Sequence, residues 1–185
     1  MNELSQGGTA IGTGINSHKD FSKNFCLEVN KLSKFKTKPA KNFYQGLSSV
    51  DNAVELSSAL KNLSIILSKI CNDLRWMNSG PLTGLGEIEL EAHQPGSSIM
   101  HGKVNPVICE AAMQVFCQVV GNDVAITTAS SGGIGSILEL NLCMPVIAER
   151  LTESIMLLAG AVSTLDEKLI QGLEVNKEIA EGLVE

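Results

Sequence analysis

Residues 51–77, DNAVELSSALKNLSIILSKICNDLRWM, give the clearest indication of the fold. Its large apolar residues alternate spacings of four and three: Leu56, Leu60, Leu63, Leu67, Ile70, Leu74 and Met77. This heptad pattern predicts a long helix with one apolar stripe, as in helical bundles and coiled coils. Asp51 is suited to cap its N-terminus, and Gly80-Pro81 is expected to end it.

A second heptad seam lies near the C-terminus, and it comprises Leu151, Ile155, Leu158, Val162, Leu165 and Leu169. It predicts a helix over about residues 136–170, in which Pro145 either introduces a kink or marks the true start. Two further helices are expected, one over residues 17–32 capped by Ser17 and one that Asn105-Pro106 opens. Because a helix must bury its apolar stripe, the sequence predicts an all-α bundle of long helices that self-associates.

The composition supports helices and excludes several classes of function. Hydrophobic residues make up 44% of the 185 residues but aromatic residues only 4%, whereas β-sandwiches and barrels favour aromatic side chains. The net charge of -6 argues against nucleic acid as a partner. The chain has no apolar run of about 18 residues, so no membrane association is expected, and its N-terminus resembles no secretory signal.

The cysteines and histidines predict neither disulfides nor a metal site. The five cysteines are scattered without a C-x-x-C pair, which favours free thiols in a reducing cytoplasm. His18, His93 and His101 are too widely spaced for a metal cluster. The glycine-rich residues 7–16 lack the Lys-Ser/Thr of a phosphate loop. We therefore expect no metal and no cofactor.

Residues 96–106, GSSIMHGKVNP, carry the most chemistry. Two glycines bracket two hydroxyls and a lysine, and this arrangement predicts a mobile loop, because glycine permits backbone conformations that other residues resist. A lysine ammonium and an asparagine amide suit a carboxylate ligand. A hydroxyl beside them becomes a base if its pKa is lowered. The alternative is an ordinary loop between two helices.

The loop resembles the signature Gly-Ser-Ser-x-Met-Pro-x-Lys-x-Asn of the fumarase/aspartase superfamily at every fixed position but one, where His101 replaces proline. Residues 7–16, GGTAIGTGIN, are similar to the GGTAVGTGLN stretch of that family. Residues 72–76 (NDLRW) and 79–81 (SGP) resemble the helix end before its mobile loop. The motifs occur in family order along nearly the whole chain.

Several positions point to one branch of the superfamily. Gly102 and the stretches 84–88 (GLGEI) and 109–111 (CEA) resemble class II fumarases, whereas residues 176–178 (NKE) resemble aspartases. The resemblance implies reversible trans hydration of fumarate to malate, a step of the tricarboxylic acid cycle. Ammonia elimination from aspartate stays open as an alternative.

The resemblance also assigns residues to roles. Ser97 would be the base, and Lys103 and Asn105 would hold the substrate carboxylate as negative charge grows on it in an aci-carboxylate intermediate. Ser98 and Val104 would contribute loop contacts. Glu110 would orient a catalytic histidine by accepting a hydrogen bond from one imidazole nitrogen.

One part of the family pattern is missing from this sequence. No run similar to Thr-His-Leu-Gln-Asp, which carries the family histidine, occurs in it. In the family, segments of three subunits of a homotetramer form each active site. We therefore interpret residues 1–185 as a single partial domain, the second half of the central helical domain, without the family's N-terminal and C-terminal domains. Alone, the chain is expected to show little activity, and a non-catalytic helical assembly module is the remaining hypothesis.

Overall fold

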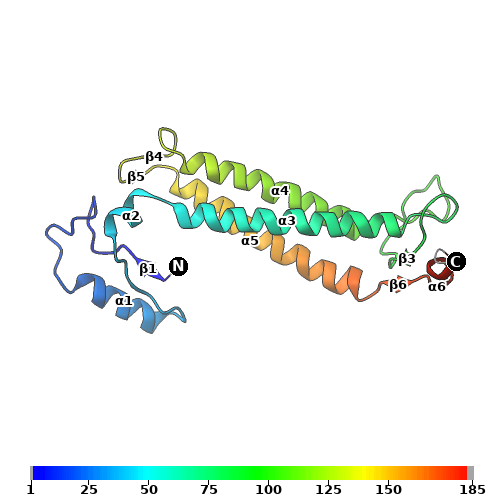
Figure 1. The fold of residues 1–185 in the computed structure, drawn as a ribbon, viewed down its shortest axis with the longest axis horizontal. Coiled ribbons are helices and arrows are strands. Elements are labelled where there is room, and N and C mark those ends of the chain that lie inside the picture. The colour runs from blue at the N-terminus through cyan, green and yellow to red at the C-terminus, as the bar shows by residue number, and fades with distance from the viewer. Residues whose placement is uncertain (1, 183–185) are drawn as a thin grey trace. The chain divides into compact units, whose positions relative to one another are not determined.

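The structure of the chain is a computed structural model that describes residues 2–182. Helices dominate it (Figure 1), which confirms the expected all-α class. They are α1 (Phe21–Leu32), α2 (Phe43–Ser48), α3 (Asp51–Met77), α4 (Val107–Ser130), α5 (Met144–Leu165), the π-helical turn η1 (Asp166–Ile170) and α6 (Lys177–Gly182). The strands are two residues each: β1 (Glu3–Leu4), β2 (Lys38–Pro39), β3 (Ile88–Glu89), β4 (Ser136–Ile137), β5 (Leu140–Asn141) and β6 (Glu174–Val175).

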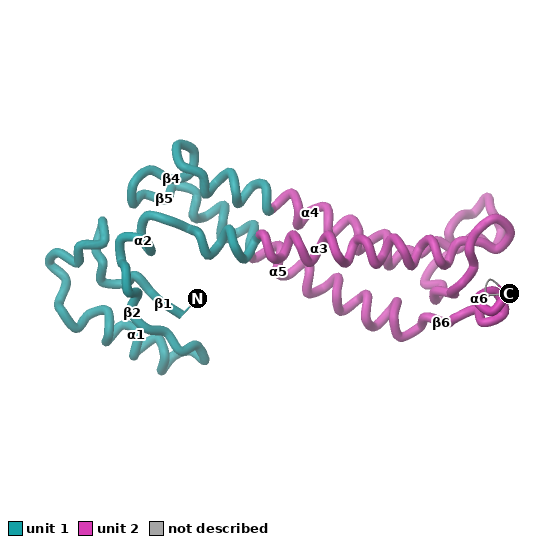
Figure 2. The backbone as a smooth tube through the Cα atoms, viewed as in Figure 1, with its two compact units in different colours: residues 1–57, 123–151 teal, residues 58–122, 152–185 magenta. Residues whose placement is uncertain are grey.

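The chain forms two compact units (Figure 2). Unit 1 comprises residues 1–57 and 123–151, and unit 2 comprises residues 58–122 and 152–185. The parallel pair β1–β2 and the hairpin β4–β5 belong to unit 1, and the antiparallel pair β3–β6 belongs to unit 2. No helix within residues 2–182 is long and apolar enough to cross a membrane.

Two predicted helix starts differ from the structure. The first helix begins at Phe21 rather than Ser17, because the Ser17 amide donates to Gly14 O in a turn. Ser17 therefore is not its cap. The last long helix begins at Met144, so Pro145 marks its start and the alternative of a kink is wrong. Residues 136–141, expected to be helical, instead form the β4–β5 hairpin.

Unit 2 holds the larger apolar core. Its buried members come from α3, α4, α5, η1 and the β3 region: Cys71, Ile88, Leu90, Cys109, Ala112, Phe116, Val119, Leu158, Ala161, Leu165 and Leu169. Leu60, Leu67 and Leu74 of the first seam pack against this core, whereas Leu63 and Ile70 of the same seam stay exposed. Leu63 and Ile70 therefore lie outside the core of unit 2.

Small residues, not the seam leucines, are the most buried on α3. Ser57, Ser64 and Cys71 follow one another at spacings of seven and are at most 3% exposed. Buried hydroxyls need partners. Ser64 donates to Leu60 O at 2.9 Å, and Ser57 donates to Asp123 Oδ1 at 2.8 Å within unit 1.

Buried polar side chains also occur on α4. In unit 2, Asn122 Nδ2 donates to Glu153 Oε2 and to Ser154 Oγ, each at 3.0 Å. These bonds join α4 to α5, because buried amides must find acceptors. The smaller core of unit 1 comprises Ile126, Ala129 and Ile147, flanked by Val50, Ala53, Cys143 and Leu151.

Candidate functional site

The predicted loop is closed at its base by main-chain contacts. The Gly96 amide donates to Lys103 O at 2.8 Å, and Pro95 and Val104 form an antiparallel bridge. Within the loop, the Lys103 amide donates to Met100 O at 3.3 Å. Two positions seven residues apart in sequence thus lie opposite each other, which brings Ser97 and Lys103 to the same end of the loop.

Glycine is required at the base of this loop. A Cβ on Gly96 would lie 2.7 Å from Lys103 O and 3.1 Å from its carbonyl carbon. Gly102 has a φ of 76°, in the left-handed region that glycine adopts without a steric penalty. The two glycines that bracket the motif therefore each have a physical reason to be there.

The two serines differ in exposure. Ser97 is half-buried and its Oγ accepts a hydrogen bond from the Ile99 amide at 3.2 Å. Ser98 is exposed. The Ser97 hydroxyl is thereby held by the loop backbone, and an amide that donates to Oγ favours its negatively charged form.

The second arm of the loop leads directly into α4. Lys103 and Val104 are exposed, whereas Asn105 is half-buried just before the helix. The Val107 amide donates to Asn105 O at 2.8 Å, and the Glu110 amide donates to Pro106 O at 3.2 Å. Glu110, half-buried, therefore lies in the first turn of α4.

All six predicted site residues thus lie on one loop and on the helix turn that follows it. Ser97, Ser98, Lys103, Val104 and Asn105 share the loop, and Glu110 follows within α4. Across residues 2–182, no hydrogen bond or ion pair joins their side chains to one another. His101, the departure from the family motif, is exposed at the loop tip.

The segment before the loop is anchored to unit 2 by side chains that the sequence analysis did not single out. The Leu90 amide donates to Asn78 Oδ1 at 2.9 Å, and His93 Nε2 donates to Lys168 O at 2.7 Å. Ile88 and Leu90 enter the core, and Ile88 pairs with Val175 across β3–β6. Only the alternation of Ile88 and Leu90 with glutamates could have indicated this strand from sequence.

No group of three or more His, Cys, Asp or Glu side chains suited to a metal ion occurs in the described part of the chain. The groups available near the loop are hydroxyl, ammonium, amide and carboxylate. Such groups can transfer a proton and hold an anionic ligand.

The sequence is similar to known lyases along its whole length. A fumarate hydratase class II from Pseudomonas aeruginosa is 51% identical over 177 residues, which cover 96% of this chain and 38% of the relative. An aspartate ammonia-lyase from Helicobacter pylori is 44% identical and matches 100% of this chain and 39% of its own length. The chain thus spans well under half the length of these relatives.

The fold is also similar to that of a known lyase. The crystal structure of a class II fumarase from Schistosoma mansoni superposes with a TM-score of 0.92 at 34% identity, over 98% of this chain and 40% of that one. The sequence signature of the family described as Lyase matches residues 1–121, more than half of the chain. The chain therefore belongs to this lyase family.

Proposed function

We propose that this chain supplies the loop-borne part of a fumarate hydratase active site, which interconverts fumarate and malate. The observation that carries the proposal is the closure of residues 96–103 by the Gly96–Lys103 bond. That bond puts a half-buried hydroxyl and a lysine at the same end of one loop. Similarity to class II fumarases, at 51% identity in the Pseudomonas relative, supports the choice of reaction.

In this mechanism Ser97 first gives its own proton to another base and then, as the alkoxide, takes the proton beside one carboxylate of malate. The electron pair left on carbon is drawn into that carboxylate, which becomes doubly charged. When this pair returns to form the double bond of fumarate, the neighbouring C–O bond breaks and the hydroxyl leaves as water with a proton from an acid on another segment. Lys103 and Asn105 hold the doubly charged carboxylate, because a fixed cation and a fixed amide donor stabilise charge that grows in the transition state. Ser98 and Val104 line the loop against the substrate. Closure of the loop excludes water and strengthens these contacts.

Glu110 acts through a histidine that this sequence does not provide in the family motif. Its place in the first turn of α4 suits a carboxylate that fixes the tautomer of an imidazole on another segment or subunit. We propose that the active assembly is a homotetramer in which residues 1–185 form part of the central helical domain. Exposed apolar side chains on α3 and α5, such as Ile66 (50% exposed) and Met156 (69% exposed), support self-association.

Two alternative functions have support of their own. The 44% identity to the Helicobacter aspartate ammonia-lyase supports ammonia elimination with the same loop. His101, in place of the family's proline in the loop, supports a helical module without catalysis. The five cysteines are free, which supports a reducing compartment, and we place the protein in the cytoplasm.

A chimera tests these functions. Residues 1–185 replace the matching segment of the Pseudomonas fumarase, and fumarate formation is followed from malate and, separately, from aspartate. We expect turnover of malate, which falls by about 100-fold or more in Lys103→Met, because one charge-stabilising contact contributes that much. Lys19→Met, at an exposed site, is the matched control and should leave the rate unchanged.

Each other result decides against the proposal. Turnover of aspartate alone would identify an ammonia-lyase. A folded tetrameric chimera without turnover of either substrate would identify a non-catalytic module. The isolated 185-residue chain should hydrate fumarate slowly or not at all, and rates equal to those of the intact relative would contradict the shared-site mechanism.

A further inference from the structure

Two cysteines meet in the core of unit 2. Cys71 lies on α3 and Cys109 on α4, and both are 0% exposed within the same apolar cluster. Arg75 and Met113, each four residues after one of these cysteines, contact each other at 3.5 Å, so the two cysteines lie on facing turns of α3 and α4. Both are free, and the proposed hydration reaction uses neither.

A cation lies beside the pair. Arg75 follows Cys71 by one turn of α3, and its charge acts on the Cys109 thiol. Its Nη1 makes only long contacts, 3.4 Å to Asn72 Oδ1 and 3.5 Å to Met113 Sδ. Its Nε is buried and, among the residues that the structure describes, has no hydrogen-bond acceptor. A buried guanidinium N–H without an acceptor is unfavourable, and a thiolate would supply the missing negative charge.

The two thiols are not equivalent. The hydrogen bond with Cys109 lowers the pKa of Cys71. The same bond, with burial, raises the pKa of Cys109 far above its ordinary value. Cys71 is therefore the group that becomes a thiolate and nucleophile, and Cys109 is the group that keeps its proton until later.

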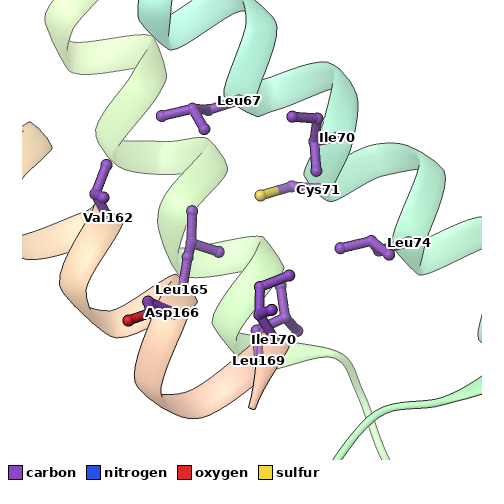
Figure 3. Close-up of a pocket in the computed structure, with 9 residues that line it drawn as sticks. All are labelled: Leu67, Ile70, Cys71, Leu74, Val162, Leu165, Asp166, Leu169 and Ile170. Atoms are coloured by element: carbon purple, nitrogen blue, oxygen red, sulfur yellow. The ribbon is translucent and has the colours of Figure 1, made fainter. Parts of the chain in front are cut away.

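A route for a small reagent lies next to Cys71. Figure 3 shows the Cys71 sulfur pointing from α3 into the space between the helices, where a cavity of about 260 Å³ is lined by Leu67, Leu74, Val162 and Leu169 among others. This volume is several times that of a water molecule, about 30 Å³. A small neutral oxidant fits, although the sulfur has no surface open to bulk water and must react during local opening.

We propose that Cys71 and Cys109 form a redox-active dithiol, which hydrogen peroxide converts into a disulfide that links α3 to α4, with Arg75 as the positioning cation. The Cys71 thiolate attacks one peroxide oxygen, the O–O bond breaks, and a sulfenic acid and hydroxide result. The hydroxide takes the Cys109 proton and becomes water. The Cys109 thiolate then displaces the sulfenic oxygen as hydroxide, which takes up the proton that Cys71 released when it became a thiolate and forms the second water. Two thiols and one peroxide thus give one disulfide and two waters.

The link would fix the start of α4 to α3 immediately beside Glu110, because Cys109 precedes that residue. The inference does not depend on the proposed hydratase activity, since its readout is the covalent state of two named cysteines.

The test uses the full chain with Cys117→Ser and Cys143→Ser, which removes the more accessible thiols and keeps Cys26 as a buried internal control. The chain is exposed to hydrogen peroxide, denatured, alkylated with iodoacetamide, digested and analysed by mass spectrometry. We expect a Cys71–Cys109 peptide pair that lacks two hydrogens, while Cys26 is recovered alkylated. A non-reducing gel should show only the monomer band.

Arg75→Met should slow formation of this pair severalfold, because the Arg75 charge lowers the pKa of Cys109, which must lose its proton before it attacks, and Arg75→Lys should restore most of the rate. Recovery of Cys71 and Cys109 alkylated to the same extent as Cys26 would overturn the proposal. Random pairing with Cys26 would overturn it as well. Circular dichroism checks that the Arg75 variants keep their helices, and if they lose them the peptide map of the parent chain alone decides.

Discussion

The burial pattern of α4 is tested by one substitution made at two sites of the same helix. Val119 is 1% exposed in the core of unit 2, whereas Val124, five residues further along, is 61% exposed. Val→Ala removes the same two methyl groups at each position. Any difference between the two variants therefore reports burial alone.

The expected magnitudes follow from area and helix propensity. Loss of two buried methyl groups costs about 1.6 kcal/mol at roughly 0.8 kcal/mol each, and the cavity left behind adds about 0.5–1 kcal/mol. The higher helix propensity of alanine offsets about 0.5 kcal/mol of this loss. We expect Val119→Ala to lower the free energy of unfolding by about 1.5–2 kcal/mol. At Val124 the smaller transfer loss is offset by propensity, so its effect should be about zero.

Urea unfolding followed by far-ultraviolet circular dichroism measures both variants, at one protein concentration because self-association would shift the midpoint. A Val119→Ala variant that unfolds within 0.5 kcal/mol of wild type, roughly the scatter of surface substitutions, would refute the assigned core. Equal destabilisation by Val124→Ala would show that this exposed face is covered by another chain.

Three further outcomes are expected. Gly96→Ala should open the loop, because the new Cβ would lie 2.7 Å from Lys103 O, and hydrogen exchange at the residue 96 amide should rise about tenfold with loss of a bond of roughly 1–1.5 kcal/mol. Gly160→Ala, where nothing lies within 4 Å of the added Cβ, should stabilise α5 by about 0.5–1 kcal/mol, and a lower thermal midpoint would contradict this. The side-chain hydrogen bond from Lys38 lowers the pKa of Glu3 below its ordinary 4.5. The stabilisation of β1–β2 by this carboxylate should therefore be complete above pH 4.5 and be lost as the pH falls through the lowered folded-state pKa. A pKa of Glu3 at or above 4.5 in an NMR titration would refute this prediction.

Sequence periodicity identified the long helices but not which residues they bury most deeply. Leu60, Leu67 and Leu74 do pack on the core, as the seam predicts. Ser64 and Cys71, which follow Leu60 and Leu67 by one helical turn, are nevertheless 0% exposed. A heptad pattern identifies large hydrophobic residues as the buried ones. Where two helices pack closely, small residues are the most buried, and periodicity does not indicate which small residues these are.

The candidate site was also predicted only in part. The residue types of the loop predicted a turn at its glycines and an anion-binding role for Lys103, because a sharp turn needs glycine and an anion needs donors, whereas the role of Ser97 as the base came from the family resemblance and stays a prediction. Asn78 and His93, which anchor the preceding segment, were not found. Their partners are backbone groups of residues 12 and 75 positions away. Because nearly every residue carries the same backbone amide and carbonyl, the sequence does not indicate which of them is the partner.

Residue patterns were enough to predict the helical class, the bounds of α3 and the position of the loop, since these depend on short-range periodicity, capping and backbone freedom. Long-range packing was needed to establish that α5 begins at Met144 after a hairpin, that Gly96 and Lys103 close the loop, and that Cys71 and Cys109 lie on facing turns beside Arg75. These features join residues distant in sequence, and the free energy that selects them comes from burial and hydrogen bonding across helices rather than from any local preference.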